Sequence, residues 1–463
     1  MQNYLADSLD SIASISFHWS SDCNMACKYC YIDKDKKAMA GLNRAIRESL
    51  ENGSFAANTK RALESRKDYI ECLSLWGAEP TINSKYFKSF MYEMLDYFPK
   101  VNSVMFSTNA LLGAELIYTD FFLPLYEYAE TNQRPIRFDL QLSLDGPPEF
   151  NDESRHSGAA KNTLETCYLL IDKSPAEARY FSLNIFSKAT LDMSYMRLMN
   201  ERGVECFNWY YQFFNDVQAT AVRKIGNKNY IRVAMNGLPS LVDPGYHTIE
   251  CGKTLAQWIN HLQYVDRTKL PEYRGMPLFA QPMAGFESYW GIEDNPVAHE
   301  FNVFSCSASK NNITIDHEGT LYTCNRLCRN SALSDDFKYK HAMRAGTNLK
   351  TSDKKWLHKT WGSQSFHNDI MSRRYIFDQL ALTMAIAGQI DYKYAQDADA
   401  RLLLFYCMTS CTCHIGAEED YTQNPSLLPT SYFKLLGNGA IDELINYFKV
   451  EIARGEVKSF GNL

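Results

Sequence analysis

The sequence predicts an α/β fold in which β-strands alternate with α-helices. Short apolar or alternating runs end in polar or turn residues, and helical patterns such as Tyr86–Tyr97 and Thr163–Ile171 separate most of these runs. Such alternation predicts parallel βαβ units, which an open barrel and a doubly wound sheet satisfy equally well. The predicted strands are Ile15–Trp19, Cys72–Trp76, Val104–Asn109, Phe138–Pro147 with its closing turn, Tyr180–Ile185 and Cys206–Tyr211.

Length and composition indicate a globular chain with more than one domain. Its 463 residues exceed an ordinary domain, and 45% hydrophobic with 22% charged residues allow a large core. A net charge of −6 argues against a basic surface, so we expect no nucleic-acid partner. The sequence has neither a long apolar run nor a secretory signal, so we expect no membrane partner and a cytoplasmic location.

The cysteine spacing is the most informative feature of the sequence. Thirteen cysteines, an odd number without an export signal, indicate reduced thiols rather than a disulfide scaffold. Cys23, Cys27 and Cys30 lie on a loop after the first predicted strand, where barrel enzymes place their chemistry. A closed zinc site needs four ligands and this loop has no histidine, whereas three thiolates on a four-iron cluster leave one iron open.

The loop resembles the signature of the radical S-adenosylmethionine enzymes, Cys-x3-Cys-x2-Cys with an aromatic residue, here Tyr29, before the last cysteine. The resemblance implies a [4Fe-4S] cluster on these cysteines, whose open iron is chelated by the amino and carboxylate groups of S-adenosylmethionine. It also implies that an electron from the cluster, supplied by a donor such as flavodoxin or ferredoxin, cleaves the sulfonium. The 5′-deoxyadenosyl radical so released abstracts hydrogen from substrate. The fold implied is an open (βα)6 partial TIM barrel.

Three further segments resemble motifs of this family. Gly77–Pro80 is similar to its Gly-Gly-Glu-Pro turn, which binds the amino group, and the methyl of Ala78 is tolerable where φ need not be positive. Thr108–Ala110, at the end of the third predicted strand, is similar to the Thr-Asn-Gly strand ending of this family, with Ala110 in place of the glycine. The stretch from Ser143 to Gly146, followed by Arg155, resembles the subgroup with extra clusters. In that subgroup a serine approaches the ribose or methionine part and an arginine pairs with the carboxylate. The residues implied for cofactor binding are Tyr29, Gly77, Glu79, Ser107, Asn109, Ser143, Asp145 and Arg155.

The second half of the chain carries two more groups of cysteines. The spacing of Cys306, Gly319 and Cys324 resembles the opening of the SPASM extension, which binds auxiliary iron–sulfur clusters. Alternating residues around Asp316–Gly319 predict a β-hairpin that brings the two cysteines together. The continuation departs from that extension, so one or two auxiliary [4Fe-4S] clusters are expected, and Cys328 need not be a ligand. The candidate ligands are Cys306, Cys324, Cys328, Cys407, Cys411 and Cys413.

We therefore expect three parts of the chain. Residues 1–215 form the partial barrel, residues 216–300 a turn-rich bridging region, and residues 301–463 a small cysteine-rich auxiliary-cluster domain of SPASM type. The last contains the β-hairpin and helices at Tyr375–Ala400 and Ala440–Ala453. The scattered cysteines are expected to be buried fillers, as free cysteines usually are. They are Cys72, Cys167, Cys206 and Cys251.

The resemblance implies oxidative chemistry on a peptide or protein. Our leading hypothesis is a side-chain cross-link in a ribosomally made precursor peptide. Alternatives are formylglycine formation in a sulfatase, peptide epimerisation, oxidation of a small alcohol, and a non-catalytic iron–sulfur scaffold or electron carrier. Formylglycine-forming relatives carry an aspartate directly after the second cysteine of the SPASM opening, and here that position holds Asn325, which cannot take a proton.

The sequence assigns no acid–base residue. Asp139, Asp145 and Asp316 are candidates, but each is equally explained as a turn-former or strand-end hydrogen-bonder. Only 22 residues precede Cys23, which leaves no room for the N-terminal peptide-recognition domain of many peptide cross-linkers. A separate leader-recognition protein is therefore one possible partner besides the peptide substrate.

Overall fold

The computed structural model describes residues 13–30, 36–191, 193–235, 239–241, 312–322 and 344–346. The chain divides into two compact units. In the first are the described residues up to 188, residues 213–235, and residues 312–322 and 344–346. In the second are the described residues 189–212 and 239–241.

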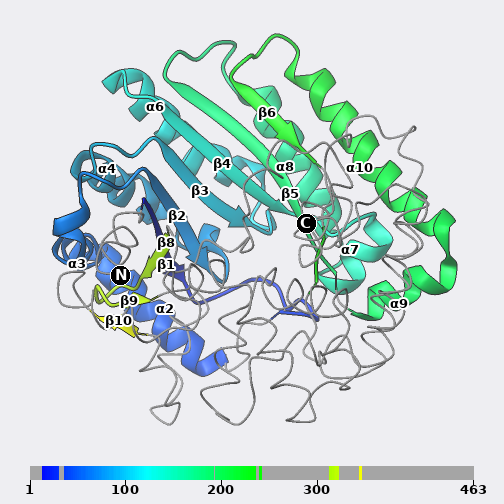
Figure 1. Ribbon diagram of the computed structural model, residues 1–463, viewed down its shortest axis with the longest axis horizontal. Coiled ribbons are helices and arrows are strands. Elements are labelled where there is room, and N and C mark those ends of the chain that lie inside the picture. Colours follow the sequence, from blue (N-terminus) through cyan, green and yellow to red (C-terminus); the bar gives the residue numbers. More distant parts are fainter. Residues whose placement is uncertain are drawn as a thin grey trace, which may run out of the picture. The chain divides into compact units, whose positions relative to one another are not determined.

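One sheet of mostly parallel strands organises the first unit (Figure 1). Its order is β10-β9-β8-β1-β2-β3-β4-β5-β6, and the pairings from β8 through β1 to β6 are all parallel. The mixed α/β class expected from the alternation is thereby confirmed. The strands of this path are β1 Ser14–Ser20, β2 Cys72–Gly77, β3 Ser103–Thr108, β4 Ile136–Ser143, β5 Phe181–Leu191, β6 Ile231–Ala234, β8 Asn312–Ile315, β9 Leu321–Tyr322 and β10 Arg344–Gly346.

From β1 to β6, helices connect consecutive strands, as βαβ units require. In the second unit, α9 is followed by the first part of α10, and residues 189–191 of β5 pair in parallel with β7, Pro239–Leu241. The helical elements are α2 Lys36–Glu51, α3 Ser54–Leu63, η1 Glu64–Arg66, η2 Pro80–Tyr86, α4 Phe87–Tyr97, α5 Ala114–Ile117, the π-helix η3 Tyr118–Phe122, α6 Leu123–Asn132, α7 Pro148–Ser154, α8 Ala159–Lys173, α9 Met193–Arg202 and α10 Val204–Ile225.

Alternate residues of β1 pack into an aromatic core between the sheet and its helices. Phe17 lies edge-on to Phe55 of α3 and Phe90 of α4, with ring centroids 5.9 and 5.0 Å apart. Trp19 contacts Phe90 at 5.2 Å, and Ile15 is fully buried. Burying each such side chain stabilises the fold by about 1.5–3 kcal/mol. This core fixes the position of β1 and hence of the loop that follows it.

The residues that alternate with this core are mostly polar, because successive side chains of a strand point to opposite faces. The register pairs Ser16 with Ser74, whose hydroxyl oxygens lie 2.9 Å apart, and Asp139 with Asn184, whose Nδ2 donates to Oδ1 of Asp139 at 2.7 Å. We call this surface the polar face of the sheet. It includes Ser16, His18, Ser74, Ser107, Asp139, Gln141, Ser143 and Asn184.

The prediction of a strand at Cys206–Tyr211 is wrong, because these residues lie in α10. The aromatic residues favour a strand by propensity. However, Phe207, Tyr210, Tyr211 and Phe214 are all fully buried, and their spacing of three, one and three residues is helical. The sixth parallel strand is β6, which lies beyond residue 215.

The predicted hairpin around Asp316–Gly319 is confirmed. β8 and β9 pair antiparallel, and Gly319 N donates to Asp316 O at 3.0 Å. Gly319 has φ 83° and lies against Asn58 of α3, whose Nδ2 donates to His317 O at 2.9 Å. The hairpin thus joins the main sheet beside β1. The predicted helices at 375–400 and 440–453 lie outside the described residues.

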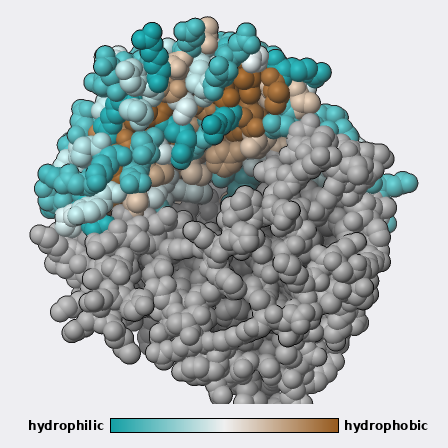
Figure 2. All heavy atoms as spheres, turned by 45° about the horizontal axis from the view of Figure 1, so that its top comes forward, coloured by the Kyte–Doolittle hydropathy of each residue, from teal (hydrophilic) through white to brown (hydrophobic). Residues whose placement is uncertain are grey.

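The described surface seen in Figure 2 is largely hydrophilic (teal) and includes an apolar area (brown). Large apolar side chains that are exposed include Tyr69, Leu112, Trp209 and Val222. Within the described part of the chain, no helix combines the length and the apolar character needed to cross a membrane.

Candidate iron–sulfur and cofactor site

The cysteine loop begins where β1 ends, and backbone hydrogen bonds hold it to the turn after β2. Ala78 N donates to Ser20 O at 2.8 Å, and Glu79 N donates to Asp22 O at 3.0 Å. Because β1 and β2 are parallel, both segments leave the same edge of the sheet. Cys23 is thereby placed directly beside the turn that resembles the Gly-Gly-Glu-Pro motif.

A second attachment holds the other end of the loop. Lys28 N donates to Ser154 O, at the end of α7, at 2.9 Å. Cys30 N donates to Cys27 O at 3.1 Å, which closes a tight turn between these two cysteines. The loop is therefore tied both to the β2 turn and to the helix that follows β4.

The three thiols of this loop are free and half-buried. Burial raises the pKa of Cys23 to about 12, and repulsion from Glu79, Cys27 and Cys30 adds to this rise. Burial also raises the pKa of Cys27, although the nearby Arg155 partly offsets it. Thiolates that repel one another at close range are stabilised by bound cationic iron. The donor set therefore fits an iron–sulfur cluster.

The arrangement of these thiols differs from that of a single-ion site. In the part of the chain that the structure describes, no three Cys, His, Asp or Glu side chains converge on one ion position. Ligands of a cluster bind different iron atoms and need not converge in this way. A cluster on these three cysteines is compatible with this arrangement.

Gly77 has a conformation and a contact that exclude a side chain. Its φ is 131°, and a Cβ atom built at this position would lie 1.9 Å from Ser20 O. Ala78 differs, since among the described residues only Ala110 and Gln133 are non-glycine residues with positive φ. The first glycine of the motif is therefore required by close approach to β1, and the second is replaceable by alanine.

Glu79 is a buried carboxylate that joins the ends of β2 and β3. Its Oε1 accepts from Thr81 N at 3.1 Å, Thr81 Oγ1 at 2.7 Å and Thr108 Oγ1 at 2.8 Å. Its Oε2 accepts from Asn109 N at 2.8 Å. Burial raises the pKa of Glu79, and these donors counter the rise. With 1% exposure, this side chain fixes the two strand ends relative to each other.

Asn109 extends from the end of β3 to the cysteine loop. Its Nδ2 donates to Asn24 Oδ1 at 2.8 Å and lies 3.7 Å from Cys23 Sγ, within hydrogen-bond reach of sulfur. Ala110, which replaces the glycine of the motif, has φ 58° and is fully buried. An alanine in this left-handed region is strained, so the turn after Asn109 is held by its surroundings.

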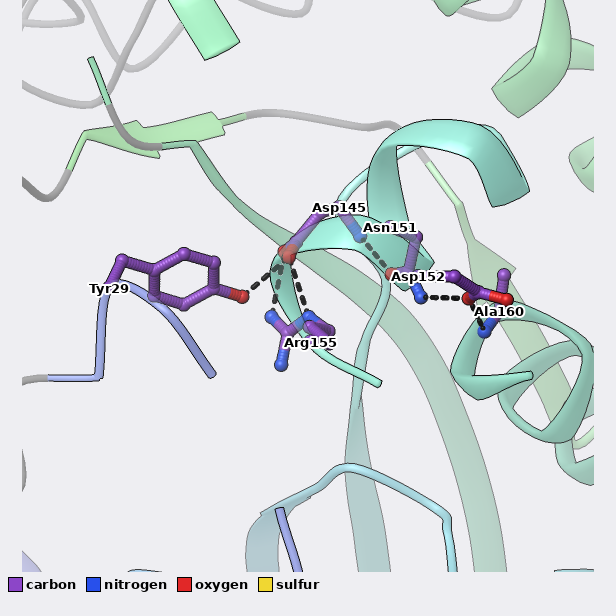
Figure 3. A network of polar contacts seen from close by, with 6 residues as sticks. All are labelled: Tyr29, Asp145, Asn151, Asp152, Arg155 and Ala160. Carbon is purple, nitrogen blue, oxygen red and sulfur yellow. Dashed lines mark hydrogen bonds and ion pairs between the residues drawn. The ribbon is translucent and has the colours of Figure 1, made fainter. Parts of the chain in front are cut away.

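Tyr29, Asp145 and Arg155 form one buried network (Figure 3). Arg155 donates through Nε to Oδ2 of Asp145 at 2.6 Å and through Nη2 to Oδ1 at 2.7 Å. Tyr29 OH donates to the same Oδ2 at 2.5 Å. Burial raises the pKa of Tyr29, and the Asp145 charge raises it further. Burial disfavours the charged form of Arg155, but Asp145 outweighs this and raises the pKa of the guanidinium.

The resemblance assigns the Arg155 fork to the carboxylate of S-adenosylmethionine, whereas here both of these donor atoms pair with Asp145. The two remaining expected residues lie on the polar face. Ser107 Oγ accepts from Gln141 Nε2 at 2.9 Å, and Ser143 is half-buried at the end of β4. The residues singled out from β1 to α7 are therefore brought to one edge of the sheet.

Asn151 and Asp152 support this network, and the sequence reasoning missed both. Asn151 Oδ1 accepts from Asp145 N at 2.9 Å, and its Nδ2 donates to Asp152 Oδ1 at 3.0 Å. Asp152 in turn accepts from Ala160 N at 2.8 Å at the start of α8 (Figure 3). It also accepts from Gly158 N at 2.6 Å. The preference of Asn and Asp for helix ends and turns was the available signal.

Asp316, a candidate acid–base residue, holds the hairpin turn. Its Oδ1 accepts from Glu318 N at 3.0 Å and Thr320 N at 2.9 Å, and its Oδ2 accepts from Tyr322 OH at 3.1 Å. Burial raises its pKa. Asp145 is likewise committed to Tyr29 and Arg155, so the contacts of both aspartates account for them without acid–base chemistry.

The other cysteines separate into two sets. Cys167 and Cys206 are buried, as expected of fillers, and Cys72 is half-buried. Cys251 lies outside the described residues. So do the six cysteines expected to bind auxiliary clusters, which are Cys306, Cys324, Cys328, Cys407, Cys411 and Cys413.

Comparison with known proteins supports the cluster assignment. Residues 14–156 match the family model described as a 4Fe-4S single cluster domain. This segment contains Cys23, Cys27 and Cys30, so an iron–sulfur cluster is a cofactor of this part of the chain. No curated protein matches the sequence.

Several solved structures are similar to the chain. Histidine-tagged anSMEcpe with bound AdoMet matches with a TM-score of 0.48 and 15% identity, covering 95% of this chain and 98% of that one. Native anSMEcpe with bound AdoMet and Cp18Cys peptide matches with a TM-score of 0.46 and 14% identity, covering 96% and 99%. Streptococcus suis SuiB bound to S-adenosylmethionine matches with a TM-score of 0.39 and 11% identity, covering 77% and 67%.

Proposed function

We propose that the chain is a radical S-adenosylmethionine enzyme that holds a [4Fe-4S] cluster on Cys23, Cys27 and Cys30. When bound, the cluster and S-adenosylmethionine supply a 5′-deoxyadenosyl radical that abstracts hydrogen from a substrate. The residues of the chain position these groups. Gly77 and Glu79 hold the β2 turn against the loop, and the remaining residues implied by the resemblance line the same edge of the sheet.

The observation that carries this proposal is the convergence of the ends of β2, β3 and β4 on the cysteine loop that follows β1. Glu79 links β2 to β3, Asn109 links β3 to Cys23, and the Asp145–Arg155 pair, which follows β4, meets Tyr29 of the loop. The first and last residues of this set, Cys23 and Arg155, are 132 positions apart in the sequence. A structural filler loop would not require polar groups from the ends of three other strands.

We further propose that the substrate is a ribosomally made peptide or a protein and that the reaction is an oxidation, forming a side-chain cross-link. The polar face supports a substrate with many hydrogen-bonding groups, as a peptide backbone has. It offers serine, glutamine and asparagine side chains along the route from the sheet to the cysteine loop. One or two auxiliary clusters on the later cysteines would accept the electron left on the substrate.

Anaerobic reconstitution with iron and sulfide tests the proposal. Reduced protein is incubated with S-adenosylmethionine, and 5′-deoxyadenosine and methionine are measured. We expect both products and distinctly more than about four irons per chain. A value near four irons refutes the auxiliary clusters, and absence of both products refutes the radical chemistry.

A matched pair of cysteine variants separates the cluster from general effects of thiol loss. Cys23→Ala should abolish 5′-deoxyadenosine formation, because the first cluster loses one of three ligands. Cys72→Ala should retain it, since the half-buried Cys72 lies beside Ser14 and Ser103 in the neighbouring strands, away from the cysteine loop. Equal activity of the two variants contradicts the ligand assignment.

The substrate is tested with a precursor-like peptide encoded beside the gene. A product lighter than the peptide by about 2 Da, the mass of two hydrogen atoms, indicates a cross-link. An unchanged mass with deuterium uptake from heavy water indicates epimerisation, which contradicts it.

A further inference from the structure

The side-chain amide of Asn24, directly after Cys23, has a fixed orientation. Asn109 Oδ1 accepts from Leu111 N at 2.9 Å, which sets the Asn109 amide group so that its Nδ2 faces Asn24. A carbonyl oxygen must then be the Asn24 atom that receives this donor, since two NH2 groups cannot pair. The NH2 group of Asn24 consequently points away from Asn109.

This NH2 group is buried without a partner. Asn24 Nδ2 has no hydrogen-bond acceptor among the described residues, although it is shielded from solvent. Leaving such a donor unpaired costs about 1–3 kcal/mol, and low-energy folds rarely keep it so. An acceptor that is not one of these protein groups would remove this cost.

Other N–H groups in the same place already point at sulfur. Met25 N donates to Cys23 Sγ at 3.4 Å, and Asn109 Nδ2 lies 3.7 Å from the same atom. Asn24 directly precedes Met25 in the loop and accepts from Asn109 Nδ2, and it follows a cysteine assigned to the cluster. The sulfur atoms of that cluster would supply the hydrogen-bond acceptor that Asn24 Nδ2 lacks among the described residues.

We propose that Asn24 donates a hydrogen bond to a sulfur atom of the cluster and, together with Asn109, raises the reduction potential of the cluster. This inference rests on the proposed function only in assigning a cluster to Cys23, Cys27 and Cys30. Hydrogen bonds to cluster sulfur stabilise the reduced, more negative state. The buried Glu79 carboxylate, which raises the pKa of Cys23, acts in the opposite direction. Asn24 thus acts on the reduction potential of the cluster and does not contact substrate.

The test is an EPR-monitored redox titration of the reconstituted full chain without S-adenosylmethionine. Asn24→Leu keeps the side-chain size and removes the donor. At the wild-type midpoint potential, we expect its ratio of reduced to oxidised cluster to fall about three- to tenfold, and a tenfold fall corresponds to about 59 mV for one electron. Asn102→Leu, at an exposed asparagine before β3, should leave the ratio unchanged.

Iron and sulfide content must match the wild type in each variant, and Asn24→Ala, which also lacks a side-chain donor, replaces the leucine variant if the latter loses its cluster. An unchanged midpoint in a fully loaded Asn24 variant overturns the proposal. So does a variant that alters only the affinity for S-adenosylmethionine. Failure of the wild-type chain to bind iron would instead refute the proposed function, so the two failures are distinguishable.

Discussion

Arg155 and Asp145 form a bidentate ion pair whose side chains are 8% and 1% exposed. The two residues lie ten positions apart and are brought together by α7, which turns the chain back after β4. Tyr29 adds a third contact from the cysteine loop. The pair therefore connects the cysteine loop to the end of β4. Its loss should destabilise both the loop and the segment that follows β4.

Asp145→Asn should destabilise the protein by about 3–5 kcal/mol, because it leaves the buried Arg155 charge without its partner. The urea midpoint, followed by tryptophan fluorescence, should fall accordingly. Glu153→Gln is the control, since the Lys28–Glu153 pair is 58% and 62% exposed and such pairs contribute less than about 1 kcal/mol. Equal midpoints for the two variants would show that the buried pair contributes no more than the surface one.

Gly77→Ala should prevent cluster incorporation, because the added Cβ would lie 1.9 Å from Ser20 O. The unusual φ costs a further amount of about 1–3 kcal/mol for a residue with a side chain. Iron content after reconstitution measures the effect. Ala78→Gly, one position later, should bind iron as the wild type does. Full iron loading of Gly77→Ala would mean that the β2 turn can move away from β1.

The strands from β1 to β5 and their helices were predictable, because alternation and apolar runs are local signals. Cys206–Tyr211 was not, since aromatic propensity for strands competed with a helical spacing that extends to Phe214. The individual site residues were found through motif spacing. Their contacts were not, because Glu79 takes its partners from the following strand and Asn109 contacts Cys23 across 86 positions.

The pH dependence of stability should change when Glu79 is replaced by glutamine. Burial raises the pKa of Glu79 above its ordinary value of 4.5, so the folded state binds this proton more tightly than the unfolded state does. The contribution of the group is complete below pH 4.5 and is lost as the pH rises through the raised pKa. Urea midpoints of Glu79→Gln should therefore fall less than those of the wild type over this rise. Glu153→Gln, at an exposed glutamate, should retain the wild-type dependence. Parallel profiles for Glu79→Gln and the wild type would contradict a raised pKa at Glu79.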